Sequence, residues 1–569
     1  MPVWFTTCKC MEGYLLDHRT EYTDVLVLGG GVSGLRAAVA ASERGADVVI
    51  VSMSVSASPE IMGFNAPVMP QDSAELYFKD LEISGYGVND SRLAQVLSDK
   101  VLGEVKYLES IGVEFERDAL DRYLPIHTLG TAYPRLIKAG NSSGTAEMRA
   151  LGSLCRKLGV KRDSPVDILG LLVSDGRAVG AYGLDKREQK LVCYYASAVV
   201  LALGGCGAMQ SFSTYPRVLI GDGYAMAYEA GARLVDMEFQ QFEPCCFVWP
   251  EKLSGKVIAT TLLRHGAILR NGEGRDFLAD YGLTRENAQK GSLARAMLSE
   301  VRAGRGTPHG GIYYDLTMMD RDFLYNDHAI FTRAAAAAGI DLCRDMPEMM
   351  PAAHTNLGGV VIGTDCSTDV AGLFACGEVT GGLHGANRLG GSAGAETVVF
   401  GHIAGDSASA YANRLGSVQM VDAERAWAKA KLSFCGISGG ELTFSASELR
   451  RKLGECLHEC LGIQRSAESI AAAGVEVRRL RSELENAHAS SLEEAAELIH
   501  LRHMLLVADM QIKASELRTE SRGVFYRTDY PVMDDPKWRK NILIRDNAGH
   551  MSLSFRDAIR CNDGIVSER

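Results

Sequence analysis

The chain has 569 residues, of which 46% are hydrophobic and 7% aromatic, and its formal net charge at pH 7 is −11. This length can form two or three domains with cores of their own, and the negative charge argues against non-specific binding to nucleic acid or anionic membranes. The first twenty residues hold several charged side chains, and nowhere do about eighteen apolar residues follow one another. We therefore expect a cytoplasmic protein with no export signal and no segment inserted directly in a membrane, with association with a membrane through a partner as the alternative.

An apolar strand at residues 24–28 leads directly into a glycine-rich turn at 29–34 (GGGVSG), followed by a helical segment at 35–44 and a strand at 48–51. This arrangement is the GxGxxG fingerprint, which places a pyrophosphate at the N-terminus of a helix. The second strand ends in Ser52 rather than in the acidic residue that usually holds a ribose hydroxyl. We expect cofactor contacts from Gly29, Gly31, Val32, Ser33, Gly34 and Ser52.

A second strand followed by glycines occupies residues 198–207 (AVVLALGGCG), and a Gly-Asp-Gly run follows at 221–223. Neither segment completes a second fingerprint that could hold a nicotinamide nucleotide beside the first dinucleotide. One dinucleotide site in a chain of this length favours a resident flavin over a diffusible coenzyme. We assign Gly204, Gly205 and Asp222 to the binding of this cofactor.

Three later segments carry polar groups next to glycines. Residues 384–391 (HGANRLGG) hold Arg388 in a glycine-bounded turn, the apolar strand at 372–376 ends at Gly377 and Glu378, and residues 351–359 contain His354. A guanidinium is always charged, and its rigid fork of donors can clamp a carboxylate in two places. Taken alone, the arginine segment fits a tight surface turn equally well.

These motifs together resemble the flavoprotein subunit family of succinate dehydrogenase, fumarate reductase and L-aspartate oxidase, over residues 22–545. Residues 236–238 (DME), 518–523 (RTESRG), Arg527 and residues 530–531 belong to the same pattern. The resemblance implies bound FAD, with hydride transfer between flavin N5 and a carbon–carbon or carbon–nitrogen bond beside a carboxylate. It also implies that His354 and Arg388 hydrogen-bond that carboxylate, and that FAD is contacted by Asp222, Glu378, Ala393 and Gly394.

Departures from the family pattern concern the attachment of FAD and the substrate wall. The loop at 52–60 contains no histidine for covalent attachment, and Glu60 takes the nearest position, so we expect noncovalent FAD. Glu243 replaces a histidine of the substrate wall, and the Thr-Glu pair of the family is not recognisable at 258–261. A carboxylate at position 243 would repel a dianion, so we expect a monocarboxylate or a substrate with a neutral or cationic tail. Cys245 and Cys246 are expected to shape this pocket.

Lys290 stands where the family has a proton-donating arginine, and Arg295 follows one helical step later. A desolvated lysine can act as a general acid or base, although a solvated surface lysine is an equal alternative. The catalytic candidates are therefore Lys290, His354, Arg388 and Glu243, and no metal site is expected.

The predicted fold is α/β, with a Rossmann-type FAD-binding domain at 22–235 and 352–410 that is interrupted by an α+β capping domain at 236–351. An N-terminal extension at 1–21, a helical domain at 420–517 and a less regular tail at 518–569 complete the chain.

The fourteen cysteines include no closely spaced run that could ligate an iron–sulfur cluster. A flavin needs a second electron route, and the family resemblance implies an iron–sulfur subunit, a quinone or molecular oxygen for it. Because residues 518–523 keep the family pattern, we expect an iron–sulfur subunit as partner. The function expected is an FAD-dependent oxidoreductase acting on an unsaturated or saturated carboxylic acid other than fumarate. An L-aspartate oxidase-like enzyme and a non-catalytic electron-transfer subunit are the alternatives.

Overall fold

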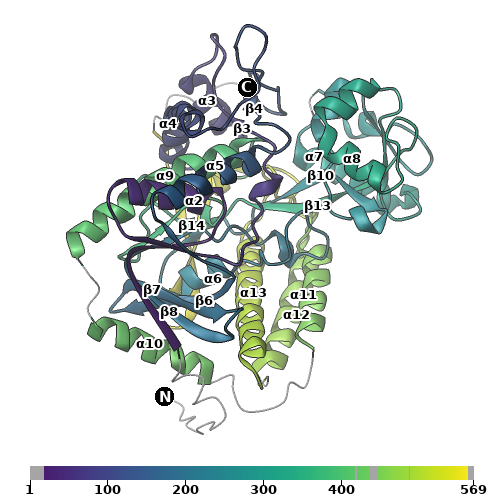
Figure 1. Ribbon diagram of the computed structural model, residues 1–569. Helices are drawn as coiled ribbons and strands as arrows, with labels where there is room; N and C mark the ends of the chain where they lie inside the picture. The colour runs from purple at the N-terminus through teal and green to yellow at the C-terminus, as the bar shows by residue number, and fades with distance from the viewer. Residues whose placement is uncertain are drawn as a thin grey trace.

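The computed structural model describes residues 18–561 except positions 287, 417–419, 436–444, 486 and 488. It shows an α/β region built on a large sheet, a smaller lobe beside it, and long C-terminal helices that lie along the α/β region (Figure 1). In the part of the chain described, no helix is both long and apolar enough to cross a membrane.

A seven-stranded sheet forms the centre of the α/β region, with strand order β5-β2-β1-β8-β7-β6 and with β15 paired to β8. Strands β1, β2, β5, β8 and β15 are parallel, whereas β6 and β7 form antiparallel pairs with their neighbours. The parallel strands β2 and β15 and the last four residues of β1 are apolar and buried, as expected where both faces of a sheet are covered, whereas the edge strand β5 (KRD) is charged and partly exposed. The strands are β1 (His18–Leu28), β2 (Val48–Val51), β5 (Lys161–Asp163), β6 (Val166–Ser174), β7 (Arg177–Asp185), β8 (Lys190–Leu201) and β15 (Leu373–Ala375).

The carboxyl ends of the central strands meet at one edge of this sheet. Leu28 at the end of β1 pairs with Val51 on β2 and with Leu201 on β8. The turns after these strands are therefore neighbours, at the edge where doubly wound sheets bind their ligands. Helices on this side and around it are α2 (Val32–Glu43), α3 (Ala74–Ser84), α4 (Ser91–Ser110), α5 (Ser143–Lys157), α6 (Asp222–Glu229) and α9 (Ser392–Leu415).

The smaller lobe is built on a second sheet, with strand order β10-β13-β12-β11, and it has a hydrophobic core of its own. It protrudes from the α/β region on the two long strands β10 and β13 (Figure 1). The predicted boundary at residue 351 falls inside β13, so the lobe and the FAD-binding domain share this strand. Its elements are β10 (Gln240–Trp249), β11 (Ile268–Arg270), α7 (Lys290–Glu300), β12 (Ile312–Asp315), α8 (Ala329–Ala337) and β13 (Glu348–Asn356).

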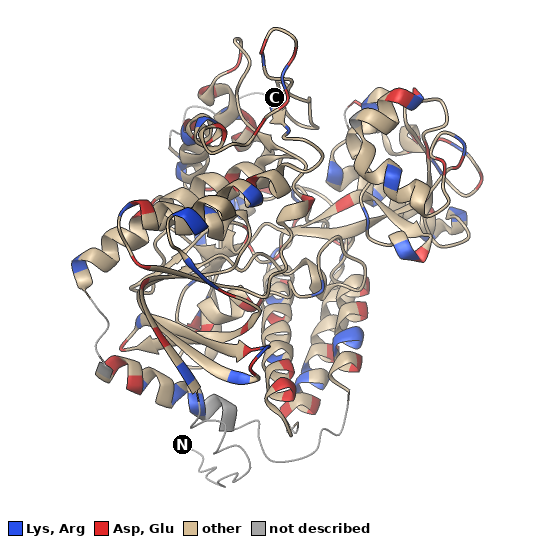
Figure 2. Ribbon diagram, viewed as in Figure 1, with Lys and Arg blue, Asp and Glu red and all other residues tan. Residues whose placement is uncertain are grey.

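The C-terminal helices are α10 (Met420–Cys435), α11 (Ala446–Cys460), α12 (Ala467–Glu485) and α13 (Leu492–Leu517), of which α13 is the most buried. Acidic and basic residues are interspersed along α10, α11 and α12 and over the smaller lobe (Figure 2). On α12, Arg479 forms ion pairs with Glu476 and Glu483. Such exposed pairs contribute little to stability.

Two terminal regions differ from the expectation. Strand β1 begins at His18, so the last residues of the expected N-terminal extension belong to the central sheet. The tail expected to be irregular forms a hairpin of β17 (Lys540–Asn547) and β18 (His550–Asp557). This hairpin extends a sheet of order β16-β14-β9-β17-β18, which also contains β9 (Leu234–Val235), β14 (Gly359–Val361) and β16 (Thr380–Gly381). Residues 550–555 (HMSLSF) alternate polar and apolar side chains, a pattern typical of a half-buried strand, so a signal for β18 was present in the sequence.

A buried ionic network anchors the segment between α13 and this hairpin. Arg518 donates to Glu238 at 2.7 Å and to Glu520 at 2.9 Å, and Arg522 donates to Glu520 at 2.7 Å. All four side chains are fully buried. Removing one member would leave an uncompensated buried charge, which costs about 3–5 kcal/mol. This network therefore fixes the C-terminal segment against the residues that precede β10.

Candidate cofactor and substrate site

One large cavity, about 1350 Å³ in volume, lies at the carboxyl edge of the central sheet and extends to the smaller lobe. Its size exceeds that of a pocket for one small ligand, about 300–1000 Å³, as expected for a dinucleotide plus a substrate. Thirteen of the sixteen predicted site residues line it, the exceptions being Val32, Gly34 and Gly205. The cavity therefore joins the predicted cofactor motifs to the predicted catalytic residues.

The glycine-rich turn fits a dinucleotide by its backbone geometry. Gly29 has φ of +120°, and a Cβ there would lie 2.1 Å from the carbonyl oxygen of Ala202. A Cβ on Gly34 would lie 2.1 Å from the carbonyl oxygen of Gly29, so this glycine permits close packing of helix α2 on the turn. The buried hydroxyl of Ser33 has no hydrogen-bond partner among the described residues. The N-terminus of α2, the glycine-rich turn packed closely against it and the Ser33 hydroxyl together form a suitable binding site for a pyrophosphate.

Ser52, at the end of β2, is buried and lines the cavity, and its hydroxyl donates to Ser164 at 3.5 Å. This position follows β2 directly, where the ribose hydroxyls of a dinucleotide are usually held. In the loop that follows, Ser58 accepts from the backbone N–H of Val32 at 3.0 Å. The loop is thus tied to the first turn of α2.

Glu378 lies in the cavity wall between the two regions. Its carboxylate accepts from the hydroxyl of Tyr215 at 2.5 Å and from the backbone N–H of Asn356 at 3.1 Å. Burial raises the pKa of Glu378 to about 7, against these two hydrogen bonds. A Cβ on Gly205 would lie 2.1 Å from its Oε1, so glycine at 205 makes room for this carboxylate. Glu378 is suited to hold a hydroxyl group of the cofactor.

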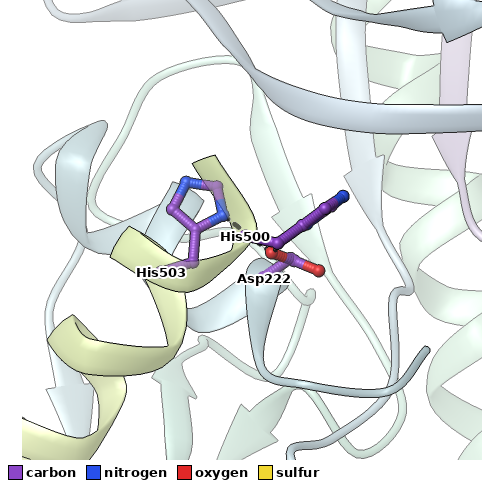
Figure 3. A group of neighbouring side chains, drawn as sticks. All are labelled: Asp222, His500 and His503. Atoms are coloured by element: carbon purple, nitrogen blue, oxygen red, sulfur yellow. Dashed lines mark hydrogen bonds and ion pairs between the residues drawn. The ribbon is translucent and has the colours of Figure 1, made fainter. Parts of the chain in front are cut away.

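Asp222 has a different environment from the one expected. Its Oδ1 atom is 2.9 Å from Nδ1 of His500 and 2.7 Å from Nδ1 of His503, both on α13 (Figure 3). Burial alone would raise the pKa of Asp222, but the two histidines hold that pKa below its ordinary value. Asp222 lines the cavity, yet its side chain is already engaged by the C-terminal helix.

Arg388 provides the clearest binding group for an anion. It is 5% exposed and donates to the carbonyl of Leu389 at 3.3 Å and to Oγ1 of Thr355 at 3.4 Å, while its Nε–H has no partner among the described residues. Gln241 on β10 donates to the Arg388 carbonyl at 3.0 Å and fixes the turn. A buried cation with an unsatisfied donor is a site for a carboxylate, because leaving such a donor unpaired is costly.

His354, on β13, also lines the cavity. Its Nδ1 lies 2.9 Å from Oγ1 of Thr214, and its ring stacks on that of Tyr215 at a centroid separation of 6.0 Å. Burial, with the nearby charges of Lys290 and Arg388, lowers the pKa of His354 to about 3. The imidazole is therefore neutral at physiological pH and can hydrogen-bond an anion without contributing charge.

Lys290 and Glu243 form an ion pair across the lobe. Lys290 begins α7 and donates through Nζ to Oε2 of Glu243 on β10, whose Oε1 accepts from Thr260 at 2.6 Å. Burial opposes ionisation of Glu243, but the charge of Lys290 and the hydrogen bonds from Lys290 and Thr260 outweigh it and lower the pKa of Glu243 to about 2. The expected repulsive carboxylate is thus compensated by Lys290. Repulsion between Glu243 and a second substrate carboxylate is therefore not a sufficient account of the charge on the substrate wall.

The neighbouring residues of the same segments point elsewhere. Arg295 donates to the carbonyl of Gly523 at 3.4 Å and lies over the ring of Tyr526, so Lys290 rather than Arg295 lines the cavity. Cys245 and Cys246 are fully buried and do not line the cavity, and burial raises the pKa of both thiols. They pack behind the substrate wall and do not shape its surface.

Sequence reasoning missed several residues of this site, namely Thr214, Tyr215, Thr260 and Thr355. Thr260 lies in the segment where the family has its Thr-Glu pair, and a threonine alone at that place was the available signal. Thr214 and Thr355 contact the catalytic candidates His354 and Arg388, and Tyr215 contacts the cofactor candidate Glu378, through polar contacts that no spacing in the sequence reveals.

Comparison with known protein families shows to which family the chain belongs. Residues 24–393 match the family described as FAD binding domain, and residues 450–561 match the family described as Fumarate reductase flavoprotein C-term. The chain belongs to the fumarate reductase flavoprotein family. The family resemblance and the fold class predicted from the sequence are confirmed, and the chain is an FAD-dependent oxidoreductase with FAD as its cofactor.

Relatives within the fumarate reductase flavoprotein family cover almost the whole chain. A fumarate reductase (CoM/CoB) subunit of Methanothermobacter marburgensis is 33% identical, over 92% of this chain and 96% of the relative. L-aspartate oxidase of Vibrio cholerae is 29% identical, over 90% and 96%. Among solved structures, the FrdA chain of E. coli quinol fumarate reductase has a TM-score of 0.89 and 27% identity, over 96% of this chain and 98% of that chain.

The attachment of FAD leads to a direct prediction. The loop after β2 contains Glu60 at the position nearest to the histidine of covalently flavinylated members, and Glu60 lines the cavity. Because the loop at 52–60 offers no histidine for a covalent bond to the flavin ring, precipitation of the purified protein with acid is expected to release all the FAD. The measurement is flavin absorbance in supernatant and pellet, and flavin retained in the washed pellet contradicts the prediction.

Proposed function

We propose that this protein reduces the carbon–carbon double bond of an α,β-unsaturated carboxylic acid, as the flavoprotein subunit of a redox complex. FAD, when bound, supplies the hydride at its N5 atom. The observation that carries the proposal is the buried Arg388, whose Nε–H is unsatisfied where Arg388 and His354 line the same cavity.

The residues of the wall suit the two halves of this reduction. Arg388 and the neutral His354 would bind the carboxylate and withdraw electron density from the double bond, which makes the β-carbon a better hydride acceptor and stabilises charge developing on the acid. Lys290 would then donate a proton to the α-carbon as a general acid. Glu243 and Thr260 hold the ammonium group in place from the other side.

The charges of the wall favour an acid with one carboxylate. Lys290 is compensated by Glu243, and His354 is neutral, so Arg388 is left as the uncompensated cation among the four catalytic candidates. A dianion would need a second cation to replace its hydration, whereas a monocarboxylate with a neutral or cationic tail would not. This charge distribution supports the prediction that fumarate is not the substrate. The reason, however, is that these four residues include no second free cation, and not that Glu243 repels a dianion.

The electron partner is proposed to be an iron–sulfur protein. The fourteen cysteines of the chain include no run with the spacing of cluster ligands, so electrons must enter or leave through another molecule. The relative from Methanothermobacter marburgensis is named as one subunit of its enzyme, which supports assembly with a partner.

Reoxidation of the reduced flavin tests the reaction. The purified protein would be reduced with dithionite under anaerobic conditions, and flavin absorbance followed after addition of fumarate or of monocarboxylic enoates of increasing tail length. Rapid reoxidation by a monocarboxylic enoate supports the proposal, and faster reoxidation by fumarate overturns the substrate class. Flavin reduction by L-aspartate, with peroxide formed on admitting oxygen, would establish the oxidase alternative instead.

His354 gives a second prediction, on pH dependence. Because the pKa of His354 is lowered to about 3, its imidazole stays neutral as the pH is raised from about 5 to 8. The pH profile of kcat/KM should therefore contain no limb from this group, and His354→Gln should lower the profile without changing its shape. A limb near pH 6.5 that disappears in His354→Gln would show that the imidazole titrates.

A further inference from the structure

The cluster at the N-terminus of α6 carries an inference that does not depend on the substrate. Asp222 begins α6, and His500 and His503 lie on one face of α13, 278 and 281 residues away in the sequence. The Nδ1 atoms of both histidines lie within hydrogen-bonding distance of the same carboxylate oxygen, and the three side chains lie together in space (Figure 3). From this geometry we propose that Asp222, His500 and His503 bind a divalent cation of the zinc type beside the FAD cavity.

The donor set matches the chemistry of such an ion. Two imidazole nitrogens and one carboxylate oxygen are the ligands of many three-residue zinc sites, in which the fourth position is left open. Zinc–ligand bonds of about 2.0–2.2 Å in a tetrahedron hold neighbouring donors about 3.3 Å apart. The present nitrogen–oxygen separations are 2.9 and 2.7 Å, so the site would open by roughly half an ångström.

The outer nitrogens of both histidines face further carboxylates. Nε2 of His500 lies 3.0 Å from Oδ1 of Asp167 on β6, and Nε2 of His503 lies 3.8 Å from Oε2 of Glu229 at the end of α6. A metal-bound histidine characteristically donates its other N–H to a carboxylate, which fixes the ring and strengthens the nitrogen as a ligand. In both rings the inward atom is Nδ1, and the outward atom is placed to serve as that donor.

The charge of the cluster is also compatible with a bound divalent cation. Asp222, Asp167 and Glu229 supply three negative charges, and a divalent cation between neutral imidazoles would leave one. Two protons on the inward nitrogens give the same total, so a purely ionic network of protonated histidines is the competing structure. Arg450 also lines this end of the cavity and would weaken a cation without excluding it.

The open position would face the cavity, because Asp222 and His500 line it whereas His503 lies behind them, only 3% exposed. A cation there would join α13 of the C-terminal helices to α6 and to β6 of the central sheet. It would thus tie the helical region to the wall of the cofactor cavity.

Zinc stoichiometry in the FAD-loaded, full-length protein tests this site. After treatment with a chelator and desalting, the protein would be dialysed against micromolar Zn²⁺ and bound zinc measured by elemental analysis. We expect one tightly bound zinc per chain, weakened about 100-fold or more by His503→Gln and about 10- to 100-fold by Asp167→Asn. The zinc-bound wild-type protein should also unfold at a higher temperature, whereas His503→Gln should not respond to zinc.

His402→Gln is the matched control. His402 also has a carboxylate at each nitrogen, Glu104 at 2.6 Å and Asp406 at 3.5 Å, but it has no second histidine beside it among the described residues. Zinc binding should be unchanged by His402→Gln. Two outcomes overturn the proposal in favour of the ionic network: the wild-type protein binds no zinc tightly, or the wild type and the milder Asp167→Asn variant bind zinc equally well. The Asp167→Asn variant gives this answer even if His503→Gln does not fold.

Discussion

Replacing Arg388 with glutamine is expected to lower kcat/KM for the acid substrate by about 10²–10³-fold, the usual cost of losing one preorganised donor to a developing negative charge. Glutamine keeps polarity and approximate length but removes the charge and the rigid fork that can grip two carboxylate oxygens. FAD should remain bound, because Arg388 contacts Thr355 and Leu389 and not the glycine-rich turn.

The measurement is the rate of reoxidation of dithionite-reduced flavin as the acid concentration is varied. Arg414→Gln is the control, since Arg414 is an exposed arginine near the end of α9 and should show wild-type rates. If Arg388→Gln passed electrons to the acid at the wild-type rate, the carboxylate would bind elsewhere. If neither protein were reoxidised by any acid, the chain would act as an electron-transfer subunit.

Replacing Lys290 with methionine is expected to abolish most turnover and also to destabilise the protein. Loss of a positioned general acid costs about 10²–10⁴-fold in rate. The side chain of Glu243 is 7% exposed, and loss of its partner leaves a buried carboxylate without a counterion. That uncompensated charge should cost about 3 kcal/mol of unfolding free energy, because Lys290, at 17% exposure, is itself partly screened by solvent.

The pH dependence of stability separates these two effects. In the wild-type protein the pKa of Glu243 is lowered from 4.5 to about 2, so its stabilising contribution is complete above about pH 4.5 and is lost as the pH falls towards 2. In Lys290→Met the buried carboxylate has a raised pKa instead, so the variant should lose stability as the pH rises above about 4.5. Urea unfolding at pH 5 and pH 7 should therefore show the larger deficit at pH 7.

The double variant Lys290→Met/Glu243→Gln completes the test of the pair. Removing both charges should restore most of the stability, because no buried ion is left unpaired, while turnover should stay as low as in Lys290→Met. A double variant that recovered turnover would show that Lys290 serves only to neutralise Glu243. Another group would then donate the proton.

The sequence predicted the parts of the fold in which local pattern and function coincide. The strand, glycine turn and helix around Gly29 could be identified because backbone approach, helix start and phosphate geometry all impose requirements within a few residues. His354 and Arg388 could be named only through a family pattern, but the structure brings both into one cavity, as that pattern requires.

The contacts that the sequence did not reveal join distant segments. Lys290 and Glu243 are 47 residues apart, and the cluster of Asp222 with His500 spans 278 residues, so neither spacing reveals a neighbour. For both of these contacts the missing information was tertiary packing, which decides the partner of a polar residue. The hairpin of β17 and β18 is a different case, because the alternation of polar and apolar residues at 550–555 was available in the sequence.

The smaller lobe is joined to the rest of the molecule by β10 and β13, and its segment, residues 240–356, carries Glu243, Lys290 and His354. Arg388, Glu378 and the glycine-rich turn all lie outside this segment. Under the proposed function, the reactive pocket is thus assembled from two separately encoded halves: one keeps the flavin and supplies Arg388, and the other supplies His354 for the carboxylate and Lys290 for the proton. A chimera that receives residues 240–356 from another family member should inherit the donor's choice of acid while retaining this chain's own flavin.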